Sequence, residues 1–138
     1  MNARTATIDQ ANSSPTGSIW VKTAYWGSTG LISLLMLYSA YSYFTSDQMV
    51  AAFQHLGFPN YFRFELGIAK ILGVIALLAP FTKTLREWAY AGFAITFISA
   101  FIAHTSSGDA LSVAIAPIVA LFFLSVSYLS NRVLQGSR

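Results

Sequence analysis

The stretch FRFELGIAKILG, residues 62–73, opens an otherwise apolar run that continues to about Phe81. A helix needs roughly 20 predominantly apolar residues to cross a bilayer, and this run has that length. Ionisable side chains inside such a run are costly and usually functional. The run therefore predicts a transmembrane helix in which Arg63, Glu65 and Lys70 need an explanation.

The composition of the whole chain favours the same location. Of its 138 residues, 55% are hydrophobic and only 9% are charged, and the mean hydropathy is +0.57. A soluble domain has about 25% charged residues, so this chain could hardly build a water-facing surface. The basic residues are dispersed rather than clustered, which argues against nucleic-acid binding.

Three further apolar runs can be read from the positions of the charges. They lie between Lys22 and Asp47, between Glu87 and Asp109, and between Asp109 and Arg132. The runs are continuous rather than alternating, which favours helices over barrel strands. We therefore expect an all-α membrane protein, an antiparallel bundle of four transmembrane helices within a domain of residues 19–138.

The ends of this domain carry two further expectations. Residues 1–18 are polar and lack the apolar core of a signal peptide, so we expect a disordered cytoplasmic tail. After the first span, the segment TSDQMVAAFQHLGFP (45–59) has a candidate N-cap, Ser46, and a candidate C-cap, Gly57. This segment predicts a short interfacial helix on the membrane surface.

The distribution of Lys and Arg predicts the orientation. Arg63 flanks one side of the spans and Lys70 lies within one, whereas six basic residues flank the other side: Arg4, Lys22, Lys83, Arg86, Arg132 and Arg138. Because basic flanks stay in the cytoplasm, we expect both termini there, in a bacterial inner membrane. Five ionisable residues then lie together at the outer face: His55, Arg63, Glu65, His104 and Asp109.

Glu65 shares a helix face with a stripe of small residues, Ala69, Gly73 and Ala76. Small residues permit close helix approach, so we expect Glu65 to point into the bundle, near His104. Arg63 and Lys70 share a different face. We expect Arg63 to be an interface anchor, and Lys70, about 10 Å deeper, to be a buried cation that needs a compensating partner.

Two other candidates have equally ordinary explanations. Tyr38 could hydrogen-bond a quinone or Glu65, although packing alone would also explain it. Asp109 is a natural N-cap of the fourth span, and His104 beside it could serve packing or proton chemistry. These residues, with Glu65 and Lys70, form the candidate ligand site.

The chain has no motif for an electron-carrying cofactor. It has no cysteine and so no disulfide, thiol redox pair or cysteine-ligated iron–sulfur or zinc site. HExxH, GxGxxG and phosphate-loop motifs are absent, and its two histidines lie in different settings. We therefore expect no metal, haem or iron–sulfur site.

Several segments resemble the DoxX-like membrane proteins. They are LGFPNYF (56–62), LGIAKILGVIALLAP (66–80), LREWAYAGFAI (85–95) and SAFIAH (99–104), the last followed by Gly108–Asp109. The resemblance covers about residues 25–130. It implies a four-helix membrane protein related to DoxX and DoxD/DoxA proteins, which are associated with respiratory or sulfur-compound oxidation and with quinones. It transfers no catalytic residue.

The leading hypothesis is a membrane component of a redox system that binds a quinone or another lipophilic molecule near the outer face. Glu65 and His104 would handle protons, and Lys70 would orient a carbonyl or stabilise an oxyanion. Lacking an electron carrier, the chain would act with a partner redox subunit or as a binding site alone. The alternatives are a small carrier or channel, built as a homo-oligomer, and a structural accessory subunit of a larger membrane complex. The sequence does not decide whether the protein is an enzyme.

Overall fold

The computed structural model describes residues 15–79 and 82–136, and this part of the chain is all-helical, as expected. Its helices are α2 (Pro15–Thr45), α3 (Asp47–His55), α4 (Asn60–Leu78), α5 (Lys83–Ser106) and α6 (Leu111–Gly136). Most of the predicted tail, residues 1–14, lies outside the described part. Residues 15–18 belong to α2 rather than to a tail.

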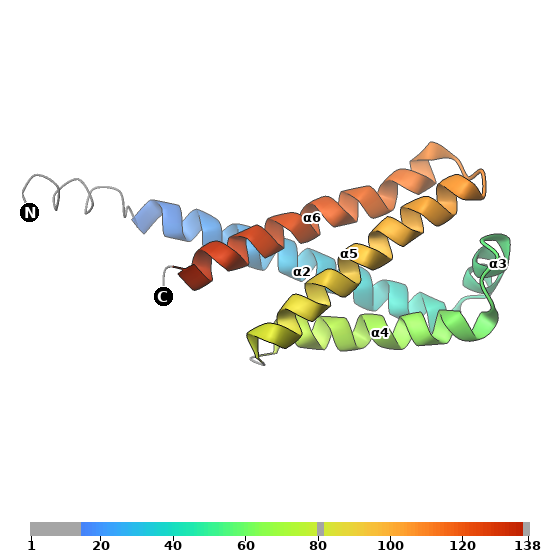
Figure 1. Cartoon of the computed structure of the whole chain (residues 1–138), viewed down its shortest axis with the longest axis horizontal. Helices are drawn as coiled ribbons and strands as arrows, with labels where there is room; N and C mark the ends of the chain where they lie inside the picture. The colour runs from blue at the N-terminus through green and yellow to red at the C-terminus, as the bar shows by residue number, and fades with distance from the viewer. Residues whose placement is uncertain (1–14, 80–81, 137–138) are drawn as a thin grey trace, which may run out of the picture.

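The four long helices run up and down with one another (Figure 1). The start of α2 and the end of α6 lie at one end of the molecule, together with the end of α4 and the start of α5. Helix α3 and the turn between α5 and α6 lie at the opposite end, which we call the α3 end. Helix α2 packs on α4 and α6, and α5 packs on α4 and α6.

Turns at the α3 end depend on two glycines with left-handed backbone angles. Gly57 (φ 79°) follows α3, and Gly108 (φ 74°) follows α5. Only glycine adopts this conformation without strain. Ser46 is the N-cap residue of α3, and Leu56 is its C-cap, one residue before the predicted Gly57.

Apolar side chains cover much of the outside of the molecule. By length and composition, α5 and α6 are the two described helices that could cross a membrane, yet only 22% and 28% of their most apolar stretches are buried. The core helix of a soluble protein would be mostly buried instead. Helix α4 is of similar apolar character, but it carries three charges in 19 residues.

The face that α4 buries differs from the predicted one. Its buried residues are Arg63, Gly67, Lys70, Val74 and Leu77, whereas Glu65 is exposed. The prediction that Glu65 points into the bundle is therefore wrong. Small residues here make room for single aromatic rings: a Cβ on Gly67 would lie 2.7 Å from Phe44 Cζ, and one on Gly73 would lie 2.5 Å from Phe93 Cζ.

Candidate ligand-binding site

A cavity of about 550 Å³ lies between the helices toward the α3 end. The end of α4 lies near the start of α5, and the two helices diverge toward α3 (Figure 1). The cavity lies where they are farther apart. Its wall is mostly apolar, with small residues such as Ala100, Ala103 and Ala116 leaving room. This volume is typical of sites that bind small molecules, roughly 300–1,000 Å³.

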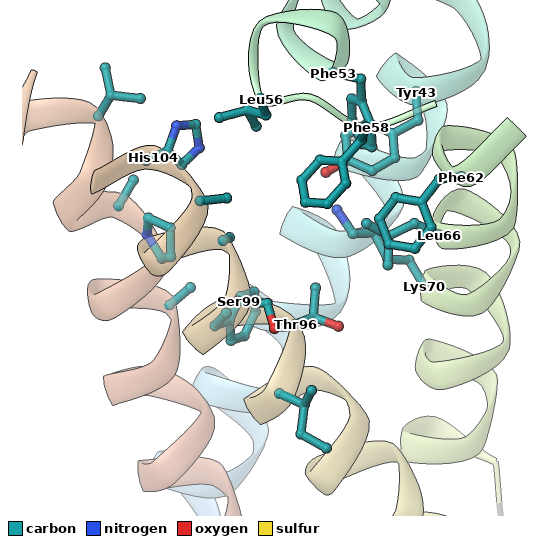
Figure 2. Close-up of a pocket in the computed structure, with 18 of the residues that line it drawn as sticks. Tyr43, Phe53, Leu56, Phe58, Phe62, Leu66, Lys70, Thr96, Ser99 and His104 are labelled. Carbon is teal, nitrogen blue, oxygen red and sulfur yellow. The ribbon is translucent and has the colours of Figure 1, made fainter. Parts of the chain in front are cut away.

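Aromatic rings from three segments close the cavity beneath α3. Phe53, the one buried residue of α3, packs edge-on against Tyr43 of α2, with ring centroids 4.9 Å apart. The ring centroids of Phe58 and of Phe62, in α4, lie 5.0 Å apart. Figure 2 shows this cluster beside Lys70. The short helix is thus held over the cavity by ring packing.

Lys70 places a cation in this aromatic wall. The residue is only 4% exposed, and its Nζ donates a hydrogen bond to Ser39 Oγ at 2.7 Å. The same nitrogen lies 3.9 Å from the centroid of the Tyr43 ring, a favourable cation–π position. No carboxylate of the described residues pairs with it. The predicted burial of Lys70 is confirmed.

Across the cavity from Lys70 stands His104 of α5 (Figure 2). Its Nδ1 lies 2.6 Å from Asp109 Oδ2, while Nε2 of His55, in α3, lies 2.8 Å from Asp109 Oδ1. Hydrogen bonds from His104 and then from His55 hold the pKa of the Asp109 carboxyl below its usual value. The carboxylate therefore ties α3 to the end of α5.

Asp109 is not the N-cap of the last helix, contrary to that reading of the sequence. The first turn of α6 bonds instead to the Ala110 carbonyl, which accepts from the N–H groups of Val113 and Ala114. Both carboxylate oxygens of Asp109 are engaged by the histidines. Charge-assisted hydrogen bonds to two imidazoles compete successfully with a single backbone amide.

The remaining candidates lie away from the cavity. Tyr38 is 72% exposed, and Glu65 is exposed on α4. Neither lines the cavity. Arg63, expected as an interface anchor, is buried instead: its Nε donates to Asn60 Oδ1 at 3.1 Å, and its guanidinium lies over the Phe64 ring.

Sequence reasoning missed Ser39 and Tyr43. The four-residue spacing of Ser39 and Tyr43 places them on one face of α2, but only the position of Lys70 shows why that matters. The dense aromatics around the short helix, such as Phe53, Phe58 and Phe62, were a usable signal for a ring-lined pocket.

Comparison with known proteins gives the family. The family model described as the DoxX-like family matches residues 27–127. This chain belongs to the DoxX-like family. No curated protein and no solved structure matches it. The DoxX-like region contains every residue that lines the cavity, and together with the two apolar helices it indicates an integral membrane protein.

Proposed function

We propose that this DoxX-like protein crosses the membrane four times, through α2, α4, α5 and α6, in a domain of residues 19–138. The apolar exposed surface and the up-and-down order of these helices support this arrangement. The basic flanks put both termini in the cytoplasm of a bacterium. Helix α3 then lies at the outer surface of the inner membrane.

The function that fits this arrangement best is binding of a lipophilic molecule with an oxygen-bearing ring, such as a quinone. One observation carries the proposal: a buried amine, that of Lys70, stands in the wall of a mostly apolar and aromatic cavity. An ammonium has three N–H donors, and the described structure gives it one hydroxyl acceptor, Ser39, and one ring face, Tyr43. A ligand carbonyl or phenolate oxygen would complete this set.

An adjoining groove offers a route from the bilayer. This groove, of about 310 Å³ between α4 and α5, shares Leu66, Lys70 and Thr96 with the cavity. Its other walls include the small residues Gly73 and Gly92. An alkyl tail can lie along this seam while the ring of the ligand occupies the cavity.

Within a redox system, the chain would hold the lipophilic molecule and a partner subunit would supply the electrons. Glu65 has no place in this scheme, because it lies outside the cavity. Lys70 would stabilise negative charge on a ligand oxygen, and His104 would face it from the other wall. A carrier, a channel and an accessory subunit are the alternatives, and none of them needs this cavity to bind a ring.

The test is binding of a decyl benzoquinone to the purified protein in lipid nanodiscs. The Lys70→Met variant should still insert, because losing a charge makes α4 more apolar, but should bind at least about tenfold more weakly. Lys83→Met makes the same chemical change at an exposed position and should bind as the unaltered protein does. Equal affinity in all three proteins, or binding by none, would contradict the proposal.

A further inference from the structure

We infer that His104 selects ligands that carry a hydroxyl group, so that the cavity prefers a hydroquinone-type molecule to its quinone. This inference rests on the proposed binding of a ring-bearing lipophile. It adds a chemical requirement at the wall opposite Lys70. The requirement follows from the hydrogen bonds that fix the imidazole.

The tautomer of His104 is set by Asp109. A carboxylate can only accept hydrogen bonds, and Asp109 Oδ2 lies 2.6 Å from His104 Nδ1. The neutral imidazole must therefore carry its proton on Nδ1, which leaves a lone pair on Nε2. Nε2 of His104 makes no hydrogen bond within residues 15–79 and 82–136.

His55 keeps the carboxylate in place for this role. Its Nε2 donates to the other oxygen of Asp109 at 2.8 Å, so the Asp109 side chain is held from both sides. The side chains of His104 and Asp109 are 23% and 21% exposed, against 55% for His55. The imidazole of His104 is thus a fixed and partly enclosed acceptor in the cavity wall, whereas His55 does not line the cavity.

Lys70 and His104, on opposite walls of the cavity, have opposite requirements, whereas the hydroxyls of Thr96 and Ser99 beside them can both donate and accept. Protonated Lys70 can only donate hydrogen bonds, and His104 Nε2 in this tautomer can only accept them. A ligand that satisfies both needs an acceptor oxygen at one end and an O–H at the other. A hydroquinone or its monomethyl ether provides this pair, whereas a benzoquinone or a hydroquinone dimethyl ether offers only acceptors.

A ligand without a hydroxyl binds with lower affinity, because it leaves His104 Nε2 buried without a hydrogen-bond donor. We therefore expect decyl hydroquinone and its monomethyl ether to bind about tenfold more tightly than the dimethyl ether. The measurement is the dissociation constant of each compound with the protein in nanodiscs, made without oxygen. The dimethyl ether is the decisive probe, because it cannot be oxidised to the quinone.

Two variants separate this role from packing. His104→Leu removes the acceptor, and with it the cost of leaving that acceptor unpaired. The three affinities should therefore converge, because the hydroxylated ligands bind more weakly and the dimethyl ether binds more tightly than to the unaltered protein. His55→Leu loosens the tie to α3 but keeps the His104–Asp109 pair, so it should preserve the order of affinities. Discrimination that survives His104→Leu would overturn the inference.

The comparison of ligands in the unaltered protein needs no variant to fold. Tight binding of all three compounds with equal affinity would overturn the preference for a hydroxyl and leave the proposed binding site standing. Binding of none of them would instead contradict the proposed function itself. The two failures are therefore distinguishable.

Discussion

At the scale of single residues, two nitrogen-bearing side chains of the cavity are each held by a definite partner. Lys70 bonds to Ser39 and lies over Tyr43, while His104 bonds to Asp109. Sequence reasoning predicted a buried Lys70 because charge in an apolar run stands out. It misplaced Glu65, because the residue lies near the start of α4 where an acid can remain at the surface.

Asp109 gives a prediction about acidity. Folding lowers the pKa of this carboxyl, so its ionised form stabilises the folded state above the ordinary Asp range, about 3.9. That contribution is lost as the pH falls through the lowered pKa. Asp109→Asn should therefore unfold at a lower temperature than the unaltered protein at pH 7, and the difference should shrink in acid.

The measurement is thermal unfolding of both proteins in detergent at a series of pH values from 7 down to 3. Asp47→Asn, which removes an exposed carboxylate at the start of α3, is the control and should show a smaller difference. A gap between Asp109→Asn and the unaltered protein that stays constant into acid would contradict the stabilising role of the carboxylate.

At the scale of helices, the existence and order of the elements could be predicted, but the faces that they bury could not. Apolar runs and turn residues such as Gly57 identify where helices end, because those signals are local. The buried face of α4 depends on which rings it meets. A stripe of small residues predicted close backbone contact, whereas Gly67 and Gly73 each accommodate a ring, those of Phe44 and Phe93.

Substitution of Gly73 tests the contact between α4 and α5. In Gly73→Ala the new methyl would lie 2.5 Å from Phe93 Cζ, and Phe93 is buried. Overpacking of this kind costs about 1–3 kcal/mol, so the variant should be destabilised. Gly92→Ala, also within a helix, meets nothing within 4 Å and should be neutral or more stable by up to about 1 kcal/mol.

Both variants are compared by chemical or thermal unfolding in the same detergent. The sign of the difference between the two is the informative result, since the chemical change is identical. Equal effects on stability would show that the Phe93 ring can shift without lowering the free energy of unfolding. There would then be no steric reason for a glycine at position 73.

At the scale of the whole molecule, buried hydroxyls connect three helices at a distance from the cavity, which lies toward the α3 end. Ser127 of α6 lies 2.6 Å from Thr29 of α2 and 2.8 Å from Tyr90 of α5, oxygen to oxygen. Satisfied polar networks of this kind fix helices against one another. This network joins α2, α5 and α6 away from the cavity.

The central claim is that the Lys70 cavity holds a lipophilic ring, and photolabelling in nanodiscs tests it most directly. After irradiation with an azido-benzoquinone that carries a decyl tail, mass spectrometry locates the modified residues. We predict adducts within residues 62–70 of α4 and 96–104 of α5, and far fewer of them in Lys70→Met. Adducts confined to exposed outer positions such as Leu34 and Phe122, or equal labelling of Lys70→Met, would contradict the claim.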